Sequence, residues 1–251
     1  MKQNIYDDEG FFRLYNEMRT DDAGRNANDL IEIPAIRKML PVLSGKKVLD
    51  LGCGAGGGLQ YFLSQGAAYV LGTDISEKMI DLARNEIHDE RCDLRVLAIE
   101  DISKIDMQFD VVVSSLALHY VADFAKVLKD VYDLLTVGGE FVFSIENPIG
   151  TGTILNEKRD GKDGIMMGNK RYFLLSDYNR SGKRVVRWND CDVIKYHRSF
   201  SEVVNAIVAS GLEIKEMVEP TPDEEVLRAN PKYADQFDKP YFLFVRLVKS
   251  H

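Results

Sequence analysis

Apolar and polar residues follow two different periods along the middle of this 251-residue chain. Short apolar runs, typical of parallel strands buried on both faces, alternate with stretches in which apolar residues recur every three or four positions. The second period is typical of helices with one buried face. The alternation predicts an α/β fold with a doubly wound parallel sheet over residues 46–146. The predicted strands of this region cover residues 48–51, 69–73, 94–98, 110–115 and 139–145.

The residues that precede this core predict a helical cap. Apolar positions recur at helical spacing in residues 11–18 and again after Pro34, whose ring suits the first turn of a helix. We therefore expect residues 1–45 to form an N-terminal helical cap. The cap either packs against the sheet or also covers a bound ligand, together with the polar loop 20–28.

The residues that follow the core predict two further parts. A glycine-rich loop over 150–170 precedes three alternating runs, which predict an antiparallel meander. We expect residues 147–200 to form an inserted small β subdomain that acts as a lid or substrate subdomain. Residues 201–251 are expected to return to the core with one capped helix and two final strands. The three runs are 172–178, 184–188 and 192–198, and the final strands are 213–218 and 241–248.

The strongest chemical signal is the segment VLDLGCGAGG at residues 48–57. Gly52, Gly54 and Gly57 fit the spacing G-x-G-x-x-G, which lets a turn between a strand and a helix approach a nucleotide closely. Asp50 lies just before this turn, where its carboxylate would repel the pyrophosphate of a dinucleotide. A ligand with ammonium and sulfonium groups and no phosphate would instead be attracted.

With its aspartate and glycines, this segment resembles motif I of the class I S-adenosylmethionine-dependent methyltransferases. The resemblance covers about residues 30–146 and, more loosely, the last two strands. It implies a Rossmann-like seven-stranded sheet with an antiparallel terminal hairpin, and S-adenosylmethionine as the cofactor. Asp50 would hold the ammonium group, Asp74 the ribose hydroxyls and Asp101 the adenine amino group, while Met79 suits either an adenine contact or the core. The implied cofactor-binding residues are Asp50, Gly52, Cys53, Gly54, Asp74, Ile75, Met79, Asp101, Ile102 and Ser115.

Two histidines are candidates for general-base catalysis, because histidine titrates near neutral pH. His119 follows the fourth predicted strand, where a methyl acceptor should approach, and His197 ends the last run of the insertion. A structural hydrogen bond is the alternative for each, since methyl transfer needs a base only when the acceptor is protonated. The candidate substrate-binding residues are Tyr15, Arg19, Tyr120 and Trp188.

The residues after the fourth strand disfavour one class of acceptor. Methyltransferases that act on adenine or glutamine carry Asn or Asp there, followed by two prolines and an aromatic residue, whereas this chain reads Ser114-Ser115-Leu116-Ala117. No carboxylate cluster matches the magnesium site of the catechol type. The predicted function is methyl transfer to a small molecule, in a pattern shared by enzymes of quinone biosynthesis. The alternatives are an NAD(P)-dependent oxidoreductase and a non-catalytic S-adenosylmethionine-binding protein.

Composition limits the expected partners. The formal net charge of −8 does not suit nucleic acids or anionic membranes, which require a basic surface. The chain shows no signal peptide and no apolar run of about 18 residues, so we expect a cytoplasmic protein with no membrane partner. Cys53, Cys92 and Cys191 have no metal-binding spacing, so no metal is expected. No pattern indicates an oligomeric state.

Overall fold

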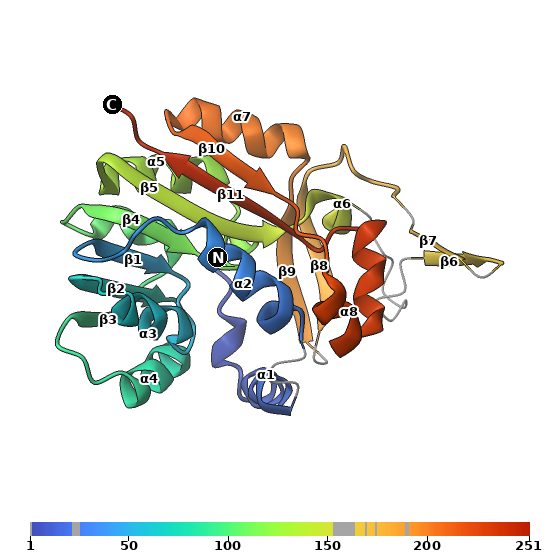
Figure 1. Cartoon of the computed structure of the whole chain (residues 1–251), viewed down its shortest axis with the longest axis horizontal. Coiled ribbons are helices and arrows are strands. Elements are labelled where there is room, and N and C mark those ends of the chain that lie inside the picture. Colours follow the sequence, from blue (N-terminus) through green and yellow to red (C-terminus); the bar gives the residue numbers. More distant parts are fainter. Residues whose placement is uncertain (1, 22–25, 153–163, 169, 174, 189–190) are drawn as a thin grey trace.

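A seven-stranded sheet forms the centre of the molecule, with the strand order β10-β11-β5-β4-β1-β2-β3 (Figure 1). The computed structural model describes residues 2–21, 26–152, 164–168, 170–173, 175–188 and 191–251. The first five strands run parallel, and β11 lies antiparallel between β5 and β10. The predicted fold class, including its antiparallel terminal hairpin, is confirmed. The strands of this sheet are β1 Lys47–Leu51, β2 Tyr69–Asp74, β3 Cys92–Val96, β4 Phe109–Ser114, β5 Leu135–Glu146, β10 Glu213–Val218 and β11 Phe242–Val248.

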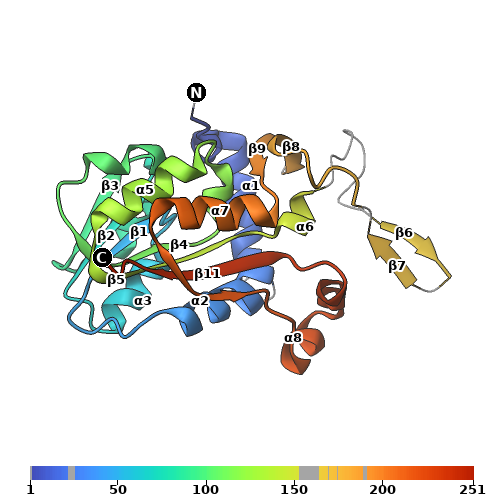
Figure 2. The same ribbon diagram turned by 90° about the horizontal axis from the view of Figure 1, so that it is seen from above.

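Helices cover both faces of the sheet because successive residues of a strand point to opposite sides. Val48 packs in a cluster with α2, α3 and α4, whereas its neighbour Leu49 packs in a cluster with α5 and α7. Figure 2 shows α2 and α3 on one side of the sheet and α5 and α7 on the other. The buried strand residues thus supply both cores. Among the described residues, no helix combines the length and apolar character needed to cross a lipid bilayer. The covering helices are α2 Ile33–Met39, α3 Gly57–Ser64, α4 Glu77–Glu86, α5 Phe124–Leu134 and α7 Phe200–Ser210.

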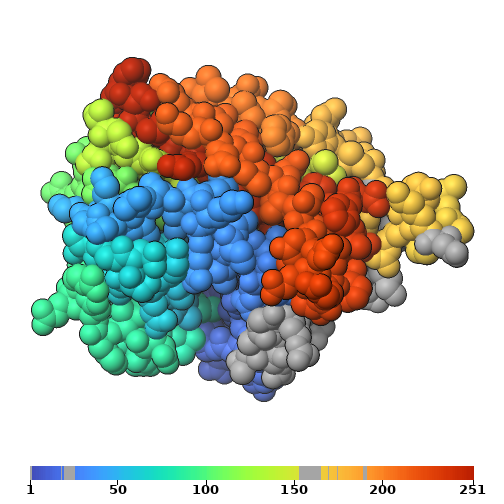
Figure 3. All heavy atoms as spheres, in the orientation of Figure 1, coloured from blue at the N-terminus to red at the C-terminus, as the bar shows by residue number. Residues whose placement is uncertain are grey.

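The N-terminal residues form helices that meet the C-terminal residues. A 3₁₀ turn, η1 (Ile5–Asp7), precedes α1 (Glu9–Asp21), and a π-helical segment, η2 (Asn28–Glu32), continues into α2. Part of the polar loop expected at 20–28 lies outside the described residues. Val226 and Tyr233 share a buried cluster with Ile31 and Ile36, and the blue and red segments adjoin in Figure 3. The C-terminal pieces in this contact are α8 Glu224–Ala229 and η5 Pro231–Phe237.

The insertion contains two separate hairpins, so the prediction of one continuous meander is wrong. β6 (Gly164–Met167) pairs with β7 (Lys170–Phe173), and β8 (Gly182–Trp188) pairs with β9 (Cys191–His197). Between the hairpins the chain turns back onto α6 (Pro148–Thr151), where the Asp177 N–H donates to the Gly152 carbonyl at 3.0 Å. β7 and β8 therefore lie in separate sheets and do not pair with each other. Much of the glycine-rich loop 150–170 lies outside the described residues.

Candidate active site

A cavity of about 950 Å³ lies at the carboxyl ends of the parallel strands. Its floor comes from the residues that follow β1, β2 and β4, and its walls come from the N-terminal segments and from the hairpin β8–β9. This is the usual ligand position in doubly wound sheets, where strand order reverses. Two short 3₁₀ segments complete the rim, η3 Ile99–Lys104 and η4 Leu118–Tyr120.

The glycine turn after β1 has a backbone that other residues would not adopt. Gly52 has a φ of +76°, and a Cβ there would lie 2.6 Å from the Cβ of Ala117. Gly54 has a φ of +53°, faces open space and donates its N–H to Asp74 Oδ2 at 3.0 Å. The turn therefore brings its backbone and Asp74 together at the cavity.

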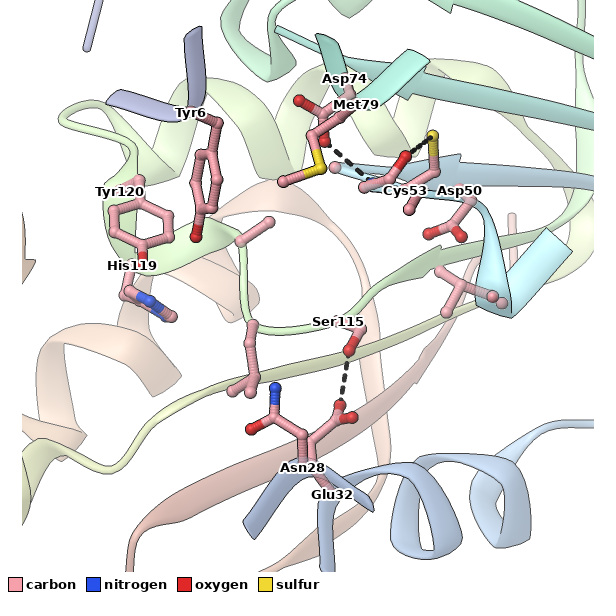
Figure 4. Close-up of a pocket in the computed structure, with 18 of the residues that line it drawn as sticks. Tyr6, Asn28, Glu32, Asp50, Cys53, Asp74, Met79, Ser115, His119 and Tyr120 are labelled. Atoms are coloured by element: carbon pink, nitrogen blue, oxygen red, sulfur yellow. Dashed lines mark hydrogen bonds between the residues drawn. The ribbon is translucent and has the colours of Figure 1, made fainter. Parts of the chain in front are cut away.

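Two aspartates at neighbouring strand ends differ in their partners (Figure 4). Asp74 accepts backbone N–H groups from Ser76 at 2.9 Å and from Gly54 at 3.0 Å, which oppose the rise in its pKa caused by burial. Asp50 is 5% exposed, and no described residue donates a hydrogen bond to its carboxylate. Burial, with the nearby charges of Asp74 and Glu32, raises the pKa of Asp50 to about 7. Asp50 is therefore a buried acid that has no counter-ion among the described residues.

The predicted adenine end is only partly assembled as the sequence suggested. Ile75 and Met79 line the cavity, but Asp101 and Ile102 do not. Asp101 forms ion pairs with Lys2 and Lys104 at the surface, and Ile102 is fully buried in the core. The reason is the 3₁₀ segment η3, in which Ile99 and Glu100 face the cavity instead. The residues that were predicted to bind the cofactor and that do line the cavity are Asp50, Gly52, Cys53, Gly54, Asp74, Ile75, Met79 and Ser115.

The opposite end of the cavity is aromatic. Tyr15, Tyr120 and Trp188, all predicted from the sequence, line it together with Tyr6. The Tyr15 ring centre lies 5.2 Å from that of Tyr6 and 6.1 Å from that of Trp188, in edge-to-face contacts. Burial raises the pKa of Tyr6 and of Tyr120, so both hydroxyls stay neutral. Sequence analysis missed Tyr6 because a lone tyrosine in a polar N-terminus has no periodic signal.

Arg19 lies on the same wall, one turn after Tyr15. It lines the cavity and donates hydrogen bonds to Asn26 and Asp29, each at 3.2 Å. Tyr15 and Arg19 therefore both line the cavity, and their contact with a substrate stays a prediction.

His119 lines the cavity as a neutral ring. Burial lowers its pKa to about 4. Its Nδ1 accepts the backbone N–H of Glu146 at 3.4 Å, which assigns the ring proton to Nε2. His119 can thus donate a hydrogen bond into the cavity, but it is a weak base at neutral pH.

Lys195 and Glu146 form an ion pair beside this histidine. Burial is the largest effect and alone would raise the pKa of Glu146, but Lys195, together with His119 and Lys239, holds that pKa below its usual range. The Lys195 Nζ lies 5.6 Å from the ring centre of Trp188 and 5.9 Å from that of Tyr120. The pair adds no net charge to the aromatic end.

His197 does not lie at the cavity. It is fully buried, its Nδ1 lies 2.8 Å from the Thr151 hydroxyl, and its Nε2 lies 2.8 Å from the Tyr178 carbonyl. Both ring nitrogens are engaged, so His197 ties β9 to α6 and the geometry gives it no access to a substrate. The structural alternative considered for this histidine fits its position.

Fold and cavity together define a class: a doubly wound α/β protein that binds a ligand over the ends of β1 and β2 and closes its sheet with an antiparallel strand. A family model described as "Methyltransferase domain" matches residues 49–143. The solved S-adenosylmethionine-dependent methyltransferase of Mesorhizobium loti has a TM-score of 0.77 and 35% identity, covering 86% of this chain and 97% of its own. The chain belongs to the S-adenosylmethionine-dependent methyltransferases.

Two curated relatives extend the comparison. A Haemophilus influenzae protein described as uncharacterized is 34% identical over 99% of this chain and 98% of its own length. The ubiquinone biosynthesis O-methyltransferase of Coxiella burnetii is 36% identical over 107 residues, which are 42% of this chain and 45% of that enzyme. The chain therefore spans about half the length of that second relative.

The residues of the cavity fit S-adenosylmethionine. The buried Asp50 carboxylate has no hydrogen-bond donor among the described residues, and a cationic ammonium group would supply one. Asp74 retains free acceptor positions beside its two backbone donors, which suits ribose hydroxyls. When bound, S-adenosylmethionine supplies a methyl group activated by a sulfonium. The protein is an enzyme that uses this methyl donor.

Proposed function

We propose that this enzyme transfers the methyl group to a small molecule bound at the aromatic end of the cavity. The observation that carries the proposal is one continuous cavity of about 950 Å³, which reaches from Asp50 and Asp74 to Tyr120 and Trp188. Sites for small ligands span roughly 300 to 1,000 Å³, so this cavity lies at the upper end of that range, and we propose that it holds the donor together with a second small molecule.

The walls of the aromatic end support a small acceptor. The segment η1 with α1 encloses it from one side and the hairpin β8–β9 from another, and both contribute lining residues. We propose that the part of the insertion formed by β8–β9 is the substrate subdomain expected within residues 147–200. The Coxiella burnetii relative, named for O-methylation in ubiquinone biosynthesis, supports an acceptor of metabolite size.

We propose that Tyr15, Arg19, Tyr120 and Trp188 contact the acceptor and that His119 donates a hydrogen bond to it. Methyl transfer is an in-line displacement, so groups that fix the distance and angle between the reacting atoms supply much of the catalysis. The buried aromatic rings offer rigid apolar contact, and the neutral hydroxyls of Tyr6 and Tyr120 can orient the acceptor through hydrogen bonds.

The proposal is tested by incubating the protein with methyl-labelled S-adenosylmethionine and a bacterial extract divided into ultrafiltrate, protein and nucleic acid. We expect label in the ultrafiltrate. Trp188 is the only tryptophan, so its fluorescence reports binding of the same ultrafiltrate. Label confined to protein or nucleic acid would refute the small acceptor. Donor binding with no label in any fraction would favour the non-catalytic alternative.

A further inference from the structure

Glu32 is a buried carboxylate in which one oxygen accepts two hydrogen bonds and the other accepts none from the described residues. It is the last residue of η2, is 1% exposed and lines the cavity. The hydroxyls of Ser115 and Ser144 both donate to Oε1, at 2.8 and 2.6 Å (Figure 4 shows the first). No described residue donates to Oε2. A buried carboxylate oxygen that faces a cavity without a donor is a binding site for a hydrogen-bond donor of a ligand.

The backbone next to these serines is strained in a way that fixes the carboxylate. Leu116 has a φ of 49°, in the left-handed region that residues other than glycine rarely adopt. Its N–H donates to the Ser144 carbonyl at 3.1 Å and to the Ser144 hydroxyl oxygen at 3.0 Å. The Ser144 hydroxyl is thereby oriented to donate to Glu32. Strain of this kind concentrates at functional sites, where surrounding contacts maintain it.

The position of Glu32 in the sheet favours the acceptor over the cofactor. Its two serine partners follow β4 and lie within β5, whereas the cofactor aspartates end β1 and β2. The strand order places β4 and β5 on the far side of β1 from β2. His119 and Glu146 lie on this same side, at the ends of β4 and β5. Glu32 therefore belongs to the half of the cavity assigned to the acceptor.

The other titratable groups of this half are poor proton acceptors. The Nδ1 of His119 is engaged by a backbone N–H, Glu146 is paired with Lys195, and Tyr6 and Tyr120 hold their protons. Glu32 differs, because burial raises the pKa of its carboxyl above the usual range despite the two serine hydrogen bonds. A raised pKa makes a carboxylate a stronger base.

Resting on the proposed function, we propose that Glu32 receives a proton-bearing group of the methyl acceptor, a hydroxyl or an N–H, at Oε2 and takes its proton during transfer. The acceptor's oxygen or nitrogen forms a bond to the methyl carbon while the carbon–sulfur bond breaks, and that electron pair stays on sulfur. The proton moves to Oε2 and later to solvent. The acceptor class is thus an alcohol, phenol or amine, and its reacting group is not an anion, which Glu32 would repel.

The test compares Glu32→Gln with wild type in two measurements. Glutamine keeps the size of the side chain and a carbonyl oxygen for both serines, but it cannot take a proton at neutral pH. We expect calorimetric affinities for S-adenosylmethionine and S-adenosylhomocysteine to stay within about twofold of wild type. Labelling of the ultrafiltrate should fall by about 10² or more. Glu32→Asp, which retracts the carboxylate, should recover part of the labelling, and the exposed Glu90→Gln is the matched control.

The pH profile gives a readout that a structural role would not move. At saturating donor, wild-type labelling should fall as pH decreases and Glu32 becomes protonated, and Glu32→Gln should lose this acid limb. The groups that face Glu32 are Arg19 from α1, Arg37 from α2 and Asp50 from β1, besides its serines. Saturating donor separates the profile from the ionisation of Asp50, which acts on donor affinity.

Each outcome bears on one claim. If wild type labels no small molecule, the proposed function fails. If wild type labels small molecules and Glu32→Gln does so within threefold of it, the base is not Glu32 and this inference is overturned. A parallel loss of affinity for both cofactor forms, with turnover at saturation unchanged, would also overturn it and assign Glu32 to the donor. Should Glu32→Gln fail to fold, the same comparison with Glu32→Asp decides, since full labelling with an unchanged pH profile would refute the role.

Discussion

Binding of the methyl donor should depend on pH through Asp50. In the ligand-free protein the pKa of this carboxyl is about 7, because burial and the charges of Asp74 and Glu32 disfavour ionisation. A cationic ammonium beside Asp50 favours the carboxylate and lowers its pKa, so binding releases a proton below pH 7. Affinity should therefore fall as the pH falls. The ionised fraction is about nine tenths at pH 8 and about one tenth at pH 6, which predicts about tenfold weaker binding at pH 6, or about 1.4 kcal/mol.

The assay is calorimetric titration with S-adenosylhomocysteine, whose ammonium stays charged over this range, at pH 6, 7 and 8. Repeating the pH 6 titration in two buffers of different ionisation heat counts the protons released. Asp50→Asn should bind more weakly at pH 8 and lose most of the pH dependence. A wild-type affinity that is equal at pH 6 and pH 8, or a dependence that Asp50→Asn keeps in full, would refute the assignment of the ammonium group to Asp50.

Three further predictions follow from single contacts. Asp74→Ala should weaken S-adenosylhomocysteine binding at least tenfold, because each charge-assisted hydrogen bond to ribose contributes roughly 1.5 to 3 kcal/mol, and an unchanged affinity in calorimetry would contradict this. The His119 ring should titrate near pH 4 by NMR, so its stabilising effect is complete above its unfolded value of 6.5 and is lost as pH falls toward 4. His197→Ala should cost about 1 to 3 kcal/mol in denaturant unfolding, since it leaves the Thr151 and Tyr178 groups unpaired, while donor affinity stays at the wild-type value.

The positions of the core strands along the chain were predictable, because each strand is marked by a local pattern in the sequence. An apolar run that ends at Asp50 or Asp74 marks a buried parallel strand and its carboxyl end, and the ends of adjacent strands must meet. The prediction of one continuous meander was wrong because the pairing of strands is not a local property of the sequence. Alternation identifies a strand but does not name its partner, and in the insertion β7 pairs with β6 while β8 pairs with β9.

The same difference between local patterns and tertiary contacts explains which site residues could be predicted from the sequence. Asp101 and Glu100 are neighbours, and only the direction of the 3₁₀ segment η3 decides that Glu100 faces the cavity. His119 and His197 both follow strands, and the difference between a cavity wall and a buried tie comes from the elements packed around them. Glu32 left no signal at all, because its site exists only where η2 meets the ends of β4 and β5.

The charge of the cavity differs between the side that binds the methyl donor and the aromatic end. Asp50 and Asp74 give the donor side an excess of negative charge in a buried setting, where a cationic ligand is favoured. The aromatic end beyond Glu32 adds no net charge from His119, which is uncharged, or from Lys195 and Glu146, which pair with each other. Transfer removes the positive sulfonium charge, so the acidic groups hold the donor more strongly than its product. We therefore expect these carboxylates to bind S-adenosylmethionine more tightly than the spent cofactor, which eases their exchange after the methyl group has moved.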